Sequence, residues 1–272
     1  MRVIESFIAG KTGNEEECED GIFVSDDFVA VVDGATDVSG LRYEGLTGGR
    51  LAMLSCLTAL ENLDRAVDAV GAAENLTTAL AGRLGPGLTP EQRPTASITL
   101  YSAVRREIWQ IGDVDFWHSG MDVERSRMEK AVDHFSRGIR AAILSAEIER
   151  GVSREELLHN DVGREAAYML ITKQGFFCNN AQAGEWAYSA INGRPVPPHL
   201  IGVYPVAAEV TEVILASDGY PVVLPTLAQS ETRLKALLME DPLCIGALRG
   251  TKGLKPGNIS FDDRSYLRVG LD

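Results

Sequence analysis

Four short acidic segments, far apart in the chain, each adjoin an apolar run that is typical of a β-strand. They are Glu19-Asp20, Asp33-Gly34, Asp218-Gly219 and Asp262-Asp263. A strand that ends in Asp places that carboxylate at the rim of a sheet. Several such strands side by side would gather four or more oxygen ligands, whose mutual repulsion a cation would offset. The pattern therefore predicts a metal site.

Cysteine and histidine offer no competing chemistry. Neither a Cys-x-x-Cys spacing nor a nearby histidine pair accompanies the four cysteines, Cys18, Cys56, Cys178 and Cys244. We therefore expect ordinary reduced thiols. Three histidines stand alone in the sequence and receive no role: His118, His159 and His199.

The composition limits the partners that the protein can have. The chain has 272 residues, 45% of them hydrophobic, and a net charge of -13 from 39 acidic and 26 basic side chains. A charge of this sign disfavours binding to nucleic acid or to an anionic membrane, and favours metal cations or basic patches on other proteins. Neither a signal-peptide pattern nor a run of about 18 apolar residues is present. We expect a cytoplasmic protein.

Hydrophobic periodicity predicts how the acidic segments are held. Expected strands cover residues 2–8, 22–32, 95–104, 107–111, 114–117, 176–177, 186–191, 201–203, 213–216 and 265–269. Expected helices cover residues 48–63, 76–84, 121–150, 162–171 and 224–238.

This order of elements favours an α+β fold. Strands come first, then helices, more strands, more helices and a terminal strand, which indicates antiparallel sheets covered by helices. We expect one domain over residues 1–272. The helical span 121–171 interrupts the strand series and is predicted to be a lid or subdomain.

The acidic segments also resemble the successive motifs of a known family, the metal-dependent protein phosphatases (PPM or type 2C). In chain order, the matching segments are Cys18-Glu19-Asp20-Gly21, Val31-Val32-Asp33-Gly34, Pro94-Thr95-Ala96-Ser97, Gly112-Asp113, Leu215-Ala216-Ser217-Asp218-Gly219 and Asp262-Asp263-Arg264-Ser265. The resemblance extends from about Glu19 to Val269.

The resemblance implies a sandwich of two antiparallel β-sheets flanked by helices, with two Mn²⁺ or Mg²⁺ ions at one edge. Asp33 would bridge both ions, and the Gly34 carbonyl would bind one of them. Asp218 and Asp262 would hold the first ion. Glu19 or Asp20 would reach the second, partly through water. A set of ligands made only of oxygen atoms suits such hard cations.

The resemblance also implies the chemistry. Two ions that share Asp33 can acidify a bridging water, which attacks phosphorus in line while the ions neutralise the phosphoryl oxygens. Asp33 and Asp218 are accordingly the expected catalytic residues.

Other acidic residues have two readings. Asp113 either forms a turn with Gly112 or acts as a ligand, and Asp263 is expected to support its neighbour Asp262 or to form a turn. Asp133-His134 resembles a family pair that contributes to a third metal or to proton transfer. The same pair would also be ordinary on the exposed face of a helix.

One departure from the family lies before the first acidic motif. Family members often carry an Arg there that holds the substrate phosphate, whereas this chain has Glu15-Glu16-Glu17. Acidic side chains repel a phosphate dianion. Lys11 or Arg42 is the candidate substitute, and the substrate-binding residues stay unassigned.

The leading hypothesis is a metal-dependent phosphohydrolase that acts on phosphoserine or phosphothreonine, with a phosphoprotein as its partner. Two alternatives stay open. One is a non-catalytic PPM-like binding or regulatory module, which the run Glu15-Glu16-Glu17 favours. The other is a phosphatase of small metabolites.

Overall fold

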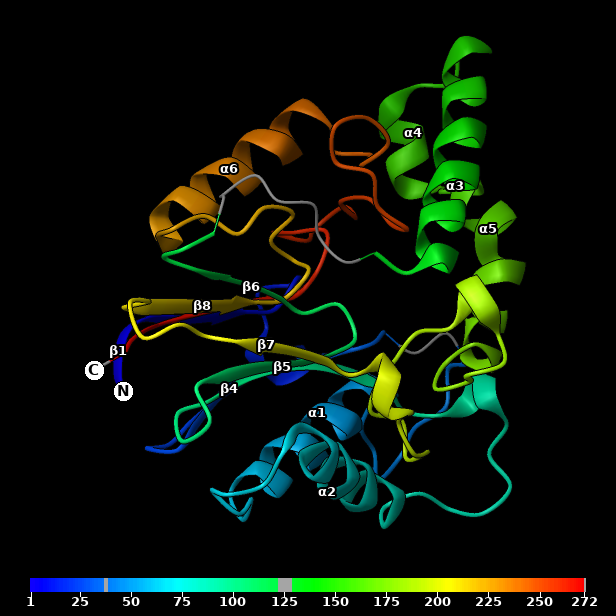
Figure 1. The fold of residues 1–272 in the computed structure, drawn as a ribbon. Coiled ribbons are helices and arrows are strands. Elements are labelled where there is room, and N and C mark those ends of the chain that lie inside the picture. Colours follow the sequence, from blue (N-terminus) through cyan, green and yellow to red (C-terminus); the bar gives the residue numbers. More distant parts are fainter. Residues whose placement is uncertain (37–38, 122–128, 272) are drawn as a thin grey trace.

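Two antiparallel sheets pack face to face between layers of helices (Figure 1). The structure is a computed structural model and describes residues 1–36, 39–121 and 129–271. The first sheet has the strand order β1 (Arg2–Ala9), β9 (Arg264–Gly270), β8 (Glu212–Ala216), β6 (Asp115–His118). The second has the order β2 (Asp20–Val24), β3 (Phe28–Gly34), β4 (Ala96–Ser102), β5 (Glu107–Ile111), β7 (Gly202–Pro205).

Strand β3 explains why the central runs are apolar without alternation. Successive side chains of a strand point to opposite faces, and both faces of β3 are covered. Phe28, Ala30 and Val32 belong to the core beneath the helices, whereas Val29 and Val31 belong to the core between the sheets. Asp33 follows in phase with Val29 and Val31, so the pleat directs it to the inter-sheet side at the rim.

Helices cover the outer face of each sheet (Figure 1). Helices α1 (Gly48–Leu60) and α2 (Ala69–Ala81) pack on the second sheet. Helix α6 (Leu227–Glu240) packs on the first sheet through Leu234 and Leu237. The termini of these helices follow capping rules, since the Thr47 side chain accepts a hydrogen bond from the Arg50 backbone N–H at the start of α1.

A helical insert stands beside one end of the sandwich (Figure 1). It consists of α3 (Ala131–Glu149), α4 (Arg154–His159) and α5 (Val162–Lys173). The buried Arg140 of α3 ties it to the rest of the chain, because its Nη1 donates to the carbonyls of Cys244 and Gly250, both at 3.2 Å. Short 3₁₀ turns complete the chain: η1 (Glu15–Glu17), η2 (Pro90–Gln92), η3 (Gln174–Phe176), η4 (Gly184–Trp186) and η5 (Pro198–Leu200).

The expected α+β class with two packed antiparallel sheets and flanking helices is confirmed. Several boundaries were wrong. The expected strand 22–32 is the hairpin of β2 and β3, and the helix expected at 76–84 is α2, which begins at Ala69.

Two expected strands do not form. Residues 176–177 and 186–191 instead make 3₁₀ turns and isolated bridges, Cys178 to Tyr188 and Ala96 to Ile191. The helix expected over 121–150 is found as α3 from Ala131, and residues 122–128 of that expectation and of the expected insert 121–171 lie outside the described residues. Helix α4 was not expected.

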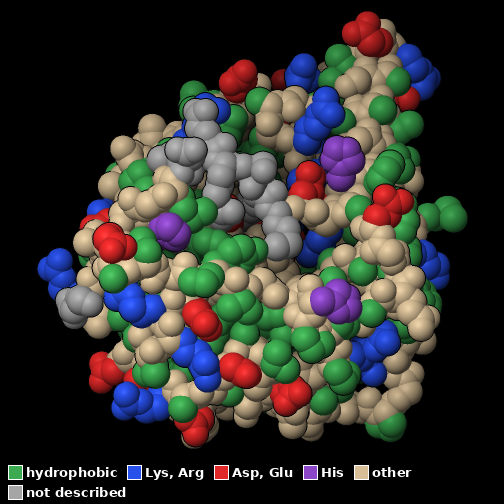
Figure 2. All heavy atoms as spheres, in the orientation of Figure 1, with side chains coloured by type: hydrophobic (Ala, Val, Ile, Leu, Met, Phe, Trp, Pro, Cys, Tyr) green, Lys and Arg blue, Asp and Glu red, His purple; other side chains and the backbone are tan. Residues whose placement is uncertain are grey.

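Two further features of the structure are the distribution of charge on its surface and the polarity of its helices. On the face drawn in Figure 2, basic and acidic side chains lie interspersed. Within the described part of the chain, every helix is too short or too polar to cross a bilayer.

Candidate metal centre

The acidic motifs meet at one rim of the sandwich, and they come from both sheets. Asp20 and Asp33 lie directly opposite each other on β2 and β3. Asp218 follows β8, and Asp262 precedes β9. The sheets are joined at this point, because the Ser265 hydroxyl of β9 donates to Asp20 Oδ2 at 2.7 Å.

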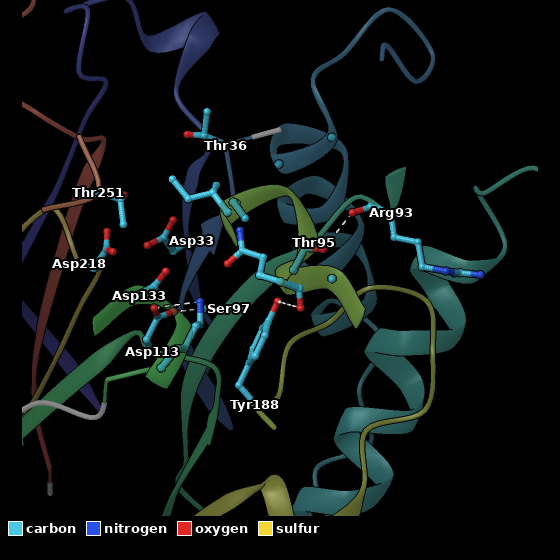
Figure 3. A pocket seen from close by; sticks show the side chains of 18 of the residues that line it. Asp33, Thr36, Arg93, Thr95, Ser97, Asp113, Asp133, Tyr188, Asp218 and Thr251 are labelled. Atoms are coloured by element: carbon cyan, nitrogen blue, oxygen red, sulfur yellow. Dashed lines mark hydrogen bonds and ion pairs between the residues drawn. The ribbon is translucent and has the colours of Figure 1, made fainter. Parts of the chain in front are cut away.

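A cavity of about 170 Å³ opens at this rim. Five aspartates line it, Asp33, Asp113, Asp133, Asp218 and Asp262, together with Glu91. Figure 3 shows Asp33 and Asp218 on either side of a common space, with Asp113 and Asp133 beside them. The structure thus brings Asp33, Gly34, Asp218 and Asp262 of the predicted ligands to a single cavity.

Charge repulsion and burial govern the protonation of this cluster. Burial raises the pKa of Asp33 well above its ordinary value, and the charges of Asp20, Asp218 and Asp262 raise it further. Burial also raises the pKa of Asp20 to about 7, although the hydroxyls of Ser217 and Ser265 act in the opposite direction. Positive charge brought among these groups would be strongly favoured.

The Glu19 side chain contacts Thr36, Thr47 and Lys11, whereas that of Asp20 contacts Ser265. Its Oε1 accepts from Thr47 Oγ1 at 2.6 Å, and its Oε2 accepts from Thr36 Oγ1 at 3.2 Å. The Lys11 ammonium lies 3.4 Å from Glu19 Oε2 and 3.0 Å from Asp263 Oδ2. Burial works to lower the pKa of Lys11, but the charges of Asp262, Asp263 and Glu19 outweigh it and raise that pKa.

Asp263 fixes the acidic turn around Lys11. Its Oδ1 accepts from the Lys11 backbone N–H at 2.7 Å, and its Oδ2 accepts from the Glu19 backbone N–H at 3.1 Å. These bonds join the start of β9 to the segment before β2, and the Asp263 backbone N–H donates to Asp262 Oδ1 at 3.0 Å.

Two further lysines pair with carboxylates of the cavity, and sequence reasoning missed both. Lys252 Nζ lies 2.6 Å from Asp262 Oδ1, and Lys130 Nζ lies 2.9 Å from Asp113 Oδ2. Neither lysine belongs to an acidic motif, although Lys252 lies only ten residues before Asp262 in the chain. The Gly112-Asp113 motif, whose carboxylate pairs with Lys130, was the one sequence signal for this part of the cavity.

At two glycines of the acidic motifs, another segment of backbone comes so close that there is no space for a side chain. A Cβ at Gly34 would lie 2.3 Å from the Gly49 carbonyl oxygen, and a Cβ at Gly219 would lie 2.0 Å from the Asp263 carbonyl oxygen. The first approach sets the start of α1 against β3, and the second sets the Asp218 turn against the Asp262-Asp263 turn. Any larger residue would separate the carboxylates by pushing these segments apart.

The two readings of Asp113 and of the pair Asp133-His134 can now be placed. Asp113 follows Gly112, whose φ is +92°, so the turn is real. Its carboxylate nevertheless lines the cavity, where Oδ1 accepts from Ser97 Oγ at 2.7 Å. Asp133 also faces the cavity and burial raises its pKa, whereas His134 is exposed on α3. The reading of both residues as an exposed pair was wrong for Asp133.

The acidic run before the first motif does not line this cavity. Glu16 and Glu17 border a separate hollow together with Lys11, Glu19 and Arg42. Lys11 is committed to Glu19 and Asp263 through the contacts given above. The two candidate substitutes for the family's Arg, Lys11 and Arg42, are therefore absent from the lining of the cavity that holds Asp33.

The donor set fits a hard divalent cation. It consists of oxygen atoms, and the buried Asp20 Oδ1 has no hydrogen-bond partner among the residues that the structure describes. Within residues 1–36, 39–121 and 129–271, however, no three acidic, histidine or cysteine side chains are already grouped as ligands of one ion. Binding would require the carboxylates to draw together, with Lys252 giving up Asp262.

Comparison with known proteins gives a likeness of fold. No protein-family profile matches the chain, and no curated protein matches it in sequence. A serine/threonine phosphatase from Mycobacterium tuberculosis, PstP/Ppp, is similar in structure, with a TM-score of 0.50 and 16% identity over 100% of both chains. The catalytic domain of PstP in complex with two manganese ions gives 0.49 and 16% over 100% of both chains.

Stp1 from Staphylococcus aureus gives a TM-score of 0.48 and 11% identity, over 98% of this chain and 94% of that one. At identities this low, structural similarity shows a shared fold but not a shared activity. The paired antiparallel sheets, the flanking helices and the order of the acidic motifs agree with the same assignment. This chain has the fold of the PPM-type serine/threonine phosphatases.

Proposed function

We propose that this protein is a metal-dependent phosphohydrolase that removes phosphate from phosphoserine or phosphothreonine of a protein substrate, with the whole chain acting as one phosphatase unit. The observation that carries the proposal is the convergence of Asp33, Asp218 and Asp262, from both sheets of a PPM-type fold, on one cavity. Motifs that served only as turns would have no reason to share a rim.

In this proposal the carboxylates of Asp33, Asp218 and Asp262, the Gly34 carbonyl and Glu19 or Asp20 hold two Mn²⁺ or Mg²⁺ ions. Such ions supply positive charge for phosphoryl oxygens and make a water nucleophilic near neutral pH. Asp113, held by Ser97 and Lys130, lines the same cavity. Asp113 and Asp133 would supply carboxylate ligands for a third ion.

A non-catalytic module is the second candidate, and one observation favours it. Three lysines already neutralise carboxylates of the rim, namely Lys11 at Asp263, Lys130 at Asp113 and Lys252 at Asp262. A cluster balanced by its own lysines has less need of metal ions. The phosphatase hypothesis is preferred because Asp20 Oδ1 is buried and has no hydrogen-bond partner in residues 1–36, 39–121 and 129–271.

Turnover of p-nitrophenyl phosphate tests the two candidates. The parent should hydrolyse it with millimolar Mn²⁺ and lose activity in excess EDTA, because oxygen-only sites exchange their ions. An inactive parent that still binds Mn²⁺ would favour the binding module. Comparison of a phosphothreonine peptide with a sugar phosphate then separates a protein phosphatase from a phosphatase of metabolites.

A further inference from the structure

The cavity of the candidate metal centre contains cations besides its carboxylates. Four basic side chains line it: Arg93, Lys130, Arg164 and Lys252. Lys130 and Lys252 are paired with Asp113 and Asp262. Arg93 donates to the Asn192 carbonyl at 3.2 Å, and Figure 3 shows its guanidinium turned away from Asp33 and Asp218.

Arg164, near the start of α5, differs from the other three. Its Nη1 donates to the Thr251 carbonyl at 2.7 Å. This is the one side-chain hydrogen bond that Arg164 makes among the described residues; the charges of Asp161 and Asp262 act on the guanidinium without an ion pair within 4.0 Å. Thr251 is the neighbour of Lys252, which contacts Asp262. The guanidinium of Arg164 therefore lies on the side of the cavity that carries Asp262. Two of its nitrogen atoms are therefore left for an anion.

The surroundings of Arg164 hold it in place. The Asp161 side chain caps α5 by accepting from the Arg164 backbone N–H at 2.8 Å. Arg140 pairs with the same carboxylate at 2.8 Å and also bonds the loop carbonyl of Gly250. Helix α5 and the loop that carries Thr251 are thus joined into one wall. Such preorganisation reduces the entropy lost when the side chain binds a ligand.

The surroundings also make Arg164 a strong anion ligand. Burial lowers the pKa of Arg164, which shows that its charge is partly desolvated. A guanidinium stays charged at neutral pH, and its planar fork matches two oxygens of a phosphate. Charge-assisted bonds of this kind are about twice as strong as neutral ones.

We infer that Arg164 binds the phosphoryl oxygens of the substrate, so that the helical insert supplies the phosphate contact that the chain lacks before its first acidic motif. The inference rests on the proposed phosphatase function. It assigns the substrate class, a phosphate monoester dianion, to the space between Arg164 and the carboxylates of Asp33 and Asp218 once these hold cations. Glu15 stands where the family places its Arg and does not line the cavity.

The test compares Arg164→Met with Arg154→Met, both at fixed Mn²⁺ and ionic strength. Arg154 is an exposed arginine of the same insert and is the matched control. For Arg164→Met we expect the KM for p-nitrophenyl phosphate and the inhibition constant of inorganic phosphate to rise about tenfold to hundredfold. We expect kcat to change less than KM, and Arg154→Met to match the parent. A role confined to folding would lower the amount of active enzyme and leave both constants unchanged.

The outcomes separate this inference from the proposed function. If the parent turns over and Arg164→Met keeps both constants within about twofold, the inference is overturned and the function stands. If the parent is inactive but binds phosphate by calorimetry, and Arg164→Met abolishes that binding, the inference stands without the function. A parent that neither turns over nor binds phosphate overturns both. If the Met variant does not fold, Arg164→Lys replaces it, because lysine keeps the positive charge but lacks the planar guanidinium. We expect a smaller rise in the same two constants. Unchanged constants would overturn the inference.

Discussion

Asp20 lies opposite Asp33 in the antiparallel pair of β2 and β3, and opposed residues of such a pair project to the same face of the sheet. Like charges in this position destabilise a sheet. The fold retains both carboxylates, and within the described part of the chain the buried Asp20 Oδ1 has no hydrogen-bond partner. In the proposed function, this pair would be stabilised by the metal ions that it helps to hold.

The first prediction concerns pH and metal. Because the pKa of Asp20 is raised to about 7 in the folded protein, the native state binds more protons than the unfolded one between the ordinary carboxyl pKa and 7. The free energy of unfolding of the metal-free protein should therefore fall as pH rises through that range. Added Mn²⁺ should raise the thermal midpoint more at about pH 8 than at about pH 5. Asp20→Asn should flatten the profile, and a metal-free midpoint that rises with pH would contradict the assignment.

The second prediction concerns the shared carboxylate. Asp33→Asn should reduce turnover at least about a hundredfold with the fold intact, because it removes the charge proposed to lie between two cations. Asp218→Asn should behave similarly. Asp26, an exposed residue in the turn at the other end of the β2–β3 hairpin, provides the control, and Asp26→Asn should match the parent. Initial rates with p-nitrophenyl phosphate and circular dichroism of each variant make the measurement, and equal rates for Asp33→Asn and Asp26→Asn would refute the site.

The third prediction concerns Asp113, for which a turn former alone would give a mild effect. Because its carboxylate pairs with Lys130 at 2.9 Å, Asp113→Asn should cost about 1 to 3 kcal/mol of unfolding free energy as well as activity. Urea unfolding measures the stability. Asp113→Asn combined with Lys130→Gln should lose less than the sum of the single variants, since neither is then left with an unpaired charge. Strict additivity would show that the two residues are not coupled.

The fourth prediction concerns the acidic run before the first motif. Glu15→Arg, which restores the type of residue that the family often has there, should leave the KM for p-nitrophenyl phosphate within about twofold of the parent. Glu15 is exposed in η1 and lies outside the cavity lining. A large fall in KM would mean that this turn reaches the substrate, and would weaken the case for Arg164.

The fifth prediction concerns the thiols. Burial raises the pKa of Cys18, Cys56, Cys178 and Cys244 to about 12 each. The thiolate is the reactive form, so iodoacetamide should modify none of them in the folded protein, and turnover should persist. Mass spectrometry after treatment, with urea-unfolded protein as the positive control, checks this. Inactivation that tracks the labelling of one cysteine would show a thiol role.

The sequence sufficed to predict the fold class and to name Asp33, Asp218 and Asp262, which line one cavity, but it left Asp133 with two interpretations. Apolar runs that end in Asp report both a buried strand and a carboxylate at its end, because local chain direction places the last side chain at the edge of the sheet. Asp33 and Asp218 could be named for that reason. Period and turn chemistry also sufficed for the hairpin of β4 and β5. They failed at residues 186–191, where apolar residues pack in irregular turns.

Only the tertiary structure showed which basic side chains lie near those carboxylates. Lys130, Arg164 and Lys252 reach the cavity from a helical insert and a late loop, and no periodicity links them to Asp33. Whether a basic side chain is bound to a carboxylate or left for a ligand depends on distances across the fold, such as the 3.0 Å from Lys11 Nζ to Asp263 Oδ2, two residues that are 252 positions apart in the chain. Local patterns in a chain do not encode such distances, because they arise from the packing of segments distant in sequence.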